Sequence, residues 1–228
     1  MMTIYFSFEV PMKFSSIILS VSAALFAGAV NAATVTLSPT ADGDVQVHGG
    51  DVFNTTDGVL SFVQSGALIR NAIMEFDLSS IVDTATINSA TLTITLTQFV
   101  SDLGSTAAID LFAYNGNGAV DIDDYDAAGT QVADTTTPTG GVAGDTRSFS
   151  FSTVAPITSA LSGNLLTLRL ETDNFATIFF GALENTTIDA AALTIDYTGP
   201  SAVPLPAGLP LLLVGLGGLA ALRRGKGA

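Results

Sequence analysis

The sequence has no cysteine and no tryptophan, and its one histidine is His48. Without cysteine the chain can form no disulfide bond and offers no thiolate to a metal or a substrate. A Ser-His-Asp hydrolase or a zinc site built from histidines would need His48, which lies beside a Gly-Gly turn. The sequence therefore predicts a protein that is not an enzyme and that is held together by buried apolar side chains.

Basic residues are also scarce, with 7 Lys and Arg against 21 Asp and Glu. The stretch 33–199 keeps three arginines and all the acids except Glu9, so its formal charge is 3 − 20 = −17. Such a charge argues against a nucleic-acid partner and against binding to anionic lipid. It suits solubility, salt tolerance and divalent cations.

The strongest apolar runs lie near the two ends of the chain, at residues 14–30 and 208–222. The first run follows Lys13 and is followed by Asn31-Ala32, where small residues suit a signal peptidase cut after Ala32. We expect residues 1–32 to be a signal peptide, with its true start at Met12 because residues 1–11 contain an acid and no base. The alternative is an N-terminal membrane anchor, for which the run is short.

The C-terminal segment, residues 200–228, combines three features in a fixed order. Val203-Pro204-Leu205-Pro206-Ala207 is an extended stretch that can join neither a helix nor a sheet ladder. An uncharged, Gly- and Leu-rich run follows, and then Arg223, Arg224 and Lys226, basic residues that stay on the cytoplasmic side of a membrane. This arrangement resembles the PEP-CTERM class of sorting signals in its VPLPA variant.

The resemblance implies a destination and a processing enzyme. PEP-CTERM proteins are exported by Gram-negative producers of exopolysaccharide, and an exosortase is thought to process them. The Pro-Leu-Pro-Ala segment would be the recognition and cleavage element, and the apolar run a short transmembrane sorting helix, held in the inner membrane in transit. The alternative is an ordinary tail anchor, although such an anchor needs no prolines and the apolar run has only 15 residues.

Between the two ends the hydrophobic pattern has the period of two that is typical of half-buried strands. In the run from Ala90 to Thr97, leucine and isoleucine alternate with threonine, and glycine-rich turns separate similar runs. No convincing long helix interrupts them. The predicted strands are Thr34–Leu37, Asp44–His48, Val59–Val63, Ala67–Phe76, Ala90–Thr97, Ala107–Tyr114, Thr146–Phe151, Leu165–Glu171, Phe175–Ala182 and Ala191–Tyr197.

Many short strands without helical crossovers predict an all-β domain at residues 33–199, an antiparallel β-sandwich of the jelly-roll form. Several segments are similar to a DNRLRE-type domain, a relative of carbohydrate-binding jelly rolls. The family's Trp-containing segment has no counterpart here, so no sugar-stacking platform is carried over. The matching segments are Thr40–Asp42, Arg70–Ile81, Ala85–Leu92, Ile157–Ala160, Ser162–Gly163, Leu165–Leu170 and Leu193–Tyr197.

For one short segment within this resemblance, the residues themselves predict a local structure. We expect Phe76-Asp77-Leu78-Ser79 to end a core strand, with Phe76 and Leu78 pointing inward. The carboxylate of Asp77 is expected to cap the turn that follows.

The best candidate for chemistry is the acidic segment from residue 115 to residue 126. Calcium prefers six to eight hard oxygen ligands from a flexible loop, although the EF-hand spacing does not fit this segment. The alternative is a solvated acidic loop. The six candidate ligands are Asn115, Asn117, Asp121, Asp123, Asp124 and Asp126.

Two functions follow from the sequence. The first is an exosortase-sorted structural or adhesive protein of the cell surface or the extracellular exopolysaccharide matrix, as in a biofilm. The second is a carbohydrate-binding module that recognises a polysaccharide through a sheet face or through the loops around residues 48–54 and 115–126.

Overall fold

The computed structural model describes residues 32–46, 52–66, 68–100 and 106–199. The predicted signal peptide up to residue 31, His48 and the whole C-terminal segment from residue 200, with the sorting motif and the basic stop, lie outside the described residues. Within the described residues, no helix is long and apolar enough to cross a membrane.

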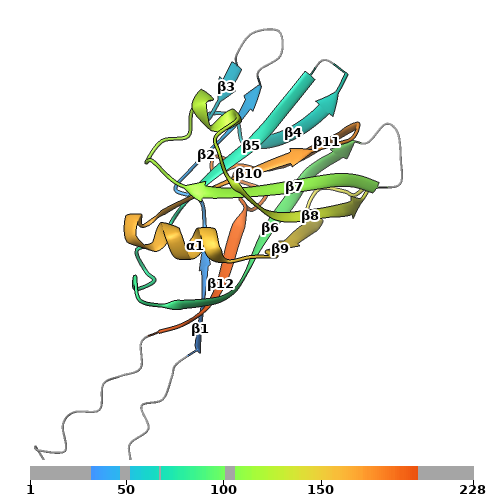
Figure 1. The fold of residues 1–228 in the computed structure, drawn as a ribbon. Helices are drawn as coiled ribbons and strands as arrows, with labels where there is room; N and C mark the ends of the chain where they lie inside the picture. The colour runs from blue at the N-terminus through green and yellow to red at the C-terminus, as the bar shows by residue number, and fades with distance from the viewer. Residues whose placement is uncertain (1–31, 47–51, 67, 101–105, 200–228) are drawn as a thin grey trace, which may run out of the picture. The chain divides into compact units, whose positions relative to one another are not determined.

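The described part of the chain consists mainly of β-strands (Figure 1). One short α-helix, α1 (Ala155–Ala160), and two 3-10 turns, η1 (Ile122–Tyr125) and η2 (Leu161–Gly163), lie between strands. The strands are β1 (Ala32–Leu37), β2 (Ala41–Gln46), β3 (Val52–Asn54), β4 (Val59–Ser65), β5 (Leu68–Asp77), β6 (Thr86–Val100), β7 (Thr106–Asn115), β8 (Thr130–Pro138), β9 (Thr146–Ser150), β10 (Leu165–Thr172), β11 (Ala176–Gly181) and β12 (Ala192–Thr198).

Nine of these strands follow one another in a strongly curled sheet, a half-barrel, in the order β1-β12-β6-β11-β4-β5-β10-β7-β8. Every pair of described strands is antiparallel. The sequence-based prediction of an all-β antiparallel fold is therefore confirmed.

Two strands organise the sheet because each pairs with three others, β5 with β2, β4 and β10 and β6 with β9, β11 and β12. In β5, Ala72 pairs with Asp44 of β2 and with Leu170 of β10, so β2 and β10 lie on opposite edges. In β6, Leu92 pairs with Leu193 of β12 and with Phe149 of β9 in the same way. The chain's first and last described strands also meet, since β1 pairs with β12 from Ala32–Thr198 to Leu37–Leu193.

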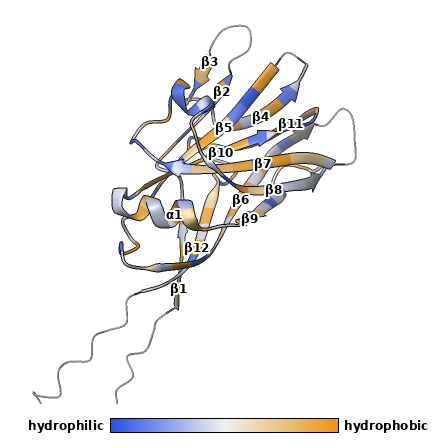
Figure 2. Ribbon diagram, in the orientation of Figure 1, coloured by the Kyte–Doolittle hydropathy of each residue, from blue (hydrophilic) through white to orange (hydrophobic). Residues whose placement is uncertain are grey.

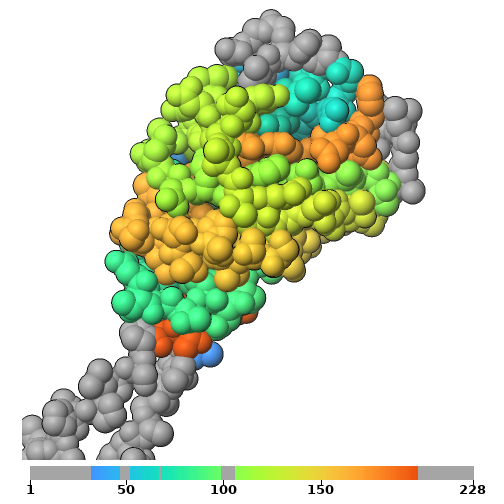
Figure 3. Space-filling view, in the orientation of Figure 1, coloured from blue at the N-terminus to red at the C-terminus, as the bar shows by residue number. Residues whose placement is uncertain are grey.

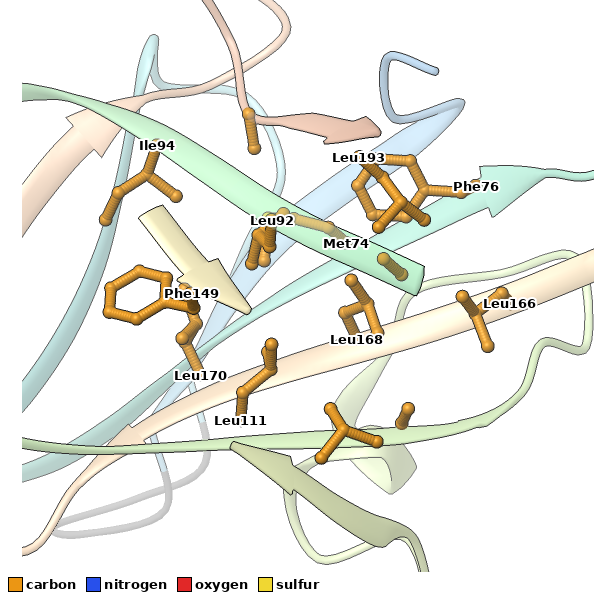
Figure 4. Packing of buried hydrophobic residues seen from close by; sticks show 14 of the residues in the cluster. Met74, Phe76, Leu92, Ile94, Leu111, Phe149, Leu166, Leu168, Leu170 and Leu193 are labelled. Atoms are coloured by element: carbon orange, nitrogen blue, oxygen red, sulfur yellow. The ribbon is translucent and has the colours of Figure 1, made fainter. Parts of the chain in front are cut away.

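The core follows from the alternation seen in the sequence. Leu92, Ile94 and Leu96 of β6 are fully buried, while the threonines between them are partly exposed. Apolar and polar residues likewise alternate along other strands (Figure 2). Figure 4 shows how leucines from β6, β10 and β12 point into one interior. Both hydrophobic clusters, with the residues packed against them, lie between residues 35 and 197, so the body 33–199 contains the whole described core.

The turn after β5 has the geometry expected from its sequence. Phe76 and Leu78 are both fully buried. Asp77 Oδ1 accepts a hydrogen bond from the backbone N–H of Ser79 at 2.8 Å, and this bond lowers the pKa of the Asp77 carboxyl. The prediction of a capped turn at the end of a core strand is confirmed.

Candidate functional site

The predicted calcium ligands lie in a loop that we call the acidic loop, residues 115–128, between β7 and β8. Three of them use their side-chain oxygens to turn the chain. Asp121 caps η1 by accepting from the backbone N–H of Asp123 at 2.9 Å, and Asp124 Oδ2 accepts from the N–H of Asp121 at 2.9 Å. Asn117 Oδ1 accepts from the N–H of Ala119 at 2.9 Å. These bonds define the shape of the loop from within.

A buried carboxylate from β5 fixes the start of the loop. Glu75 is 2 % exposed, and its Oε2 accepts from the backbone N–H of Gly118 at 3.0 Å and from Thr167 Oγ1 at 3.5 Å. The N–H of Gly116 donates to the carbonyl of Leu165 on β10 at 2.9 Å. The loop is therefore attached to two central strands of the sheet.

A buried arginine from β10 fixes the end of the loop. Nη1 of Arg169 donates to the carbonyls of Asp124 at 3.2 Å and Ala127 at 2.8 Å, and its Nε donates to Glu171. The guanidinium also lies 5.0 Å from the ring centroid of Phe112. A fixed cation of the protein thus organises the loop carbonyls.

Two further side chains hold the middle of the loop. The hydroxyl of Tyr114 donates to Asp124 Oδ1 at 3.0 Å, and Nδ2 of Asn71 donates to the carbonyl of Tyr125 at 3.1 Å. Burial, with the nearby Asp124 carboxylate as the second cause, raises the pKa of Tyr114 well above its usual range. Tyr114 therefore stays a neutral donor at physiological pH.

These contacts bear on the calcium hypothesis. The carbonyls of Asp124 and Ala127 already accept from Arg169, and the carboxylates of Asp121 and Asp124 accept from N–H groups. Within the described residues no group of three or more His, Cys, Asp or Glu side chains is placed to hold a metal ion. The other candidate ligands, Asn115, Asp123 and Asp126, are exposed. Calcium binding by this loop stays a prediction.

The structure also contains a pocket that the sequence did not indicate. A cavity of ≈ 380 Å³ lies among β2, β4, β5, β6 and β11. Most of its lining residues are polar and supply carboxylates, a guanidinium, hydroxyls and an amide, beside one valine and one aromatic ring. Its lining residues include Asp44, Asp57, Ser61, Arg70, Gln98 and Phe179.

A buried network forms one wall of this pocket. Ser61 Oγ donates to Asp44 Oδ2 at 2.8 Å, and Arg70 Nη1 lies 2.8 Å from Ser61 Oγ and 3.4 Å from Asp44 Oδ2. Burial raises the pKa of the Asp44 carboxyl, although the bonds to Ser61 and the charge of Arg70 act in the opposite direction. Nε of Arg70 is buried and has no hydrogen-bond acceptor among the described residues.

A second acid lies beside Asp44 on the same strand. Asp42 is 4 % exposed, and its Oδ2 accepts from the backbone N–H of Leu183 at 2.9 Å. Burial raises the pKa of Asp42 to about 6, and the charges of Glu184, Asp44 and Asp57 act in the same direction. Two acids two residues apart on one strand were the only sequence signal of this cluster. The predicted strand began at Asp44 and so left Asp42 outside it.

No family model matches this chain, and a search of curated proteins found no match either.

Proposed function

We propose that this chain is an exported structural or adhesive protein of the bacterial cell surface or exopolysaccharide matrix, delivered by an exosortase-type route. The observation that carries the proposal is the order of the C-terminal segment: Val203-Pro204-Leu205-Pro206-Ala207, an apolar run, and Arg223-Arg224. The order of lysine, apolar run and small residues at the N-terminus supports export. No catalytic activity forms part of this proposal.

The body supports the same proposal through the position of its ends. Ala32 pairs with Thr198, so the chain enters and leaves the sheet at neighbouring points. Such a body is suited to export as one folded unit between an N-terminal signal peptide and a C-terminal sorting segment. The curled antiparallel sheet around one large core also supports the finer assignment to a jelly-roll sandwich of the DNRLRE type, for which an experimental structure is the test.

Deleting residues 203–228 and localising the protein tests the sorting route. We expect the full chain at the cell surface or in the matrix and the truncated chain released without attachment. The mature C-terminus, measured by mass spectrometry, is expected to end before Arg223. A surface-exposed protein with Arg223-Arg224 intact would contradict the proposal.

A double substitution separates sorting from simple anchoring. Pro204→Ala with Pro206→Ala keeps the apolar run and the basic stop, so a plain tail anchor would still work. We expect this variant to stay uncleaved in the inner membrane. The matched control is Arg223→Lys, which keeps the charge and is expected to be processed like the parent chain.

A second function, recognition of a carbohydrate, is favoured by the pocket beside Arg70. Carboxylates, a guanidinium and an amide can bind the hydroxyls of a sugar, and Phe179 offers an apolar surface to its ring. Retention of the 33–199 body on a panel of insoluble polysaccharides tests this. Saturable retention on one glycan, lost in Gln98→Ala and kept in the control Gln131→Ala on β8, would support it. Absence of retention would leave the structural function alone.

A further inference from the structure

An open sheet leaves unpaired N–H and C=O groups along its edge strands, and such edges readily pair with another chain. Four strands of the described residues pair with only one neighbour. They are β1, β3, β8 and β9. The curled sheet therefore has more than one edge at which another strand could be added.

Three of these edges carry features that discourage pairing. β3 has only three residues. β8 ends in Pro138, exposes Asp134 and has an irregular register against β7. β9 has five residues, and among them Arg147 donates to the carbonyls of Thr146 and Gly140. Short length, charge, proline and irregular register are the usual protections of a sheet edge.

β1 has none of these protections. Its six residues, AATVTL, contain no charge, no proline and no glycine, and all six pair with β12 without a break in register. About three N–H and three C=O groups of a six-residue antiparallel strand point away from its neighbour. In Figure 1, β1 lies at the border of the sheet beside β12.

The surface around β1 is nearly free of charge, unlike the rest of the body. Thr34 and Thr36 are exposed, while Val35 and Leu37 pack against the core. On the outward face formed by β1, β12 and β6, Asp196 is the one acid among the described residues, and it accepts from Thr34 and Ser89. Two bodies of charge −17 repel each other least where such a face approaches its own copy.

We propose that β1 is a self-association edge, at which the β1 strands of two copies of this chain pair antiparallel and join their sheets into one. An antiparallel pairing of identical strands is two-fold symmetric, so it closes at a dimer and uses up the open edge of both copies. Threonine then lies opposite threonine on the outward face, and these hydroxyls both donate and accept. This proposal does not depend on the sorting route.

The oligomeric state of residues 32–199, which contain all of β1 and the whole described core, tests the proposal. We expect sedimentation analysis to show a monomer–dimer equilibrium that shifts toward dimer as salt is added, because salt screens the repulsion between acidic bodies. Thr36→Glu places like charges near each other at the joint and is expected to weaken dimerisation about tenfold. The matched control Thr91→Glu makes the same change on the same face, on a strand flanked by β12 and β9.

Because the chain has no cysteine, single-cysteine variants give an independent readout. Residues opposite each other in antiparallel strands bring their Cβ atoms close to disulfide distance. We expect oxidation of Thr34→Cys, Thr36→Cys or their mixture to yield a covalent dimer, and Thr91→Cys to yield none.

Two results would overturn the proposal. One is a body that stays monomeric at high concentration and high salt. The other is a dimer that Thr36→Glu and Thr91→Glu weaken equally, which would place the contact away from β1.

Discussion

Gly116 shows how little room the body leaves where the acidic loop meets the sheet. A Cβ atom at this position would lie 2.8 Å from Cβ of Leu165 and closer still to the Glu75 carboxylate. Because Glu75 also holds the N–H of Gly118, moving it would disturb both the loop and β5. The absence of a side chain at residue 116 is therefore a packing requirement.

We predict that Gly116→Ala lowers the free energy of unfolding by about 2 kcal/mol, measured by urea denaturation. Gly163→Ala is the control, since a Cβ there meets nothing within 4 Å, and we expect it to change stability by less than about 0.5 kcal/mol. Equal effects of the two substitutions would show that crowding at Glu75 is not the cause.

The buried acid Asp42 makes stability depend on pH. Its pKa is raised to about 6 in the folded chain, against 3.8 for an ordinary aspartate, so folding favours the protonated form. Its contribution is fully present below pH 3.8 and is lost as the pH rises through about 6. The neighbouring Asp44, whose pKa is also raised, acts in the same direction.

We predict that the free energy of unfolding rises by about 2 kcal/mol between pH 7.5 and pH 4.5. Urea titrations at several pH values measure it. In Asp42→Asn, which keeps an acceptor for the N–H of Leu183, this rise is expected to shrink markedly. A pH dependence that is identical in the variant would assign the effect to other groups.

Among the elements, the acidic loop is held by the protein's own cation. Figure 3 shows this segment at the molecular surface, yet Arg169 beneath it is 6 % exposed. We predict that Arg169→Lys lowers the free energy of unfolding by about 2 kcal/mol, measured by urea denaturation, because lysine cannot reach both carbonyls and Glu171. The calcium site predicted from the sequence is tested separately, by comparing the melting temperature in calcium with that in a chelator. A rise in calcium would support the site, and an unchanged melting temperature would contradict it.

The sequence predicted the elements that bury one regular face. Buried and more exposed residues alternate strictly from Ala90 to Thr97 of β6 and from Ala192 to Asp196 of β12, so the inward leucines and isoleucines there could be named from the sequence. β8 was missed because Val132 and Ala133 are buried side by side and a proline ends the strand. β3 and α1 were missed because each is too short to show a period.

The candidate sites were harder to predict because long-range contacts create them. The acidic segment stood out by composition. The side chains that hold it in place, Glu75, Asn71 and Arg169, lie on β5 and β10 and could not be connected with it from the sequence. Asp44, Ser61 and Arg70 likewise come from three strands. A hydrophobic pattern shows which residues are buried, but it does not show which buried polar residues meet.

At the scale of the whole molecule, the formal charge of −17 in residues 33–199 weakens the folded body through self-repulsion. Raising the ionic strength from about 0.01 M to about 0.15 M shortens the screening length from about 30 Å to about 8 Å. We predict a rise in melting temperature of about 3 °C, measured by calorimetry. NaCl and KCl should act equally, since screening depends only on ionic strength, and a difference between them would indicate a specific cation site.

The pairing of β1 with β12 has a consequence for the order of folding. Thr34 and Asp196, which pair in the sheet, are 162 positions apart, so the first strand stays without its partner until almost the whole body has been made. Contacts this distant in sequence form slowly, because a long loop must close before they contribute. A chain that is interrupted before residue 192 can pair its inner strands, but it exposes β1 and one edge of β6 together. Completion of β12 is thus the step that gives both β1 and this edge of β6 their partner strand.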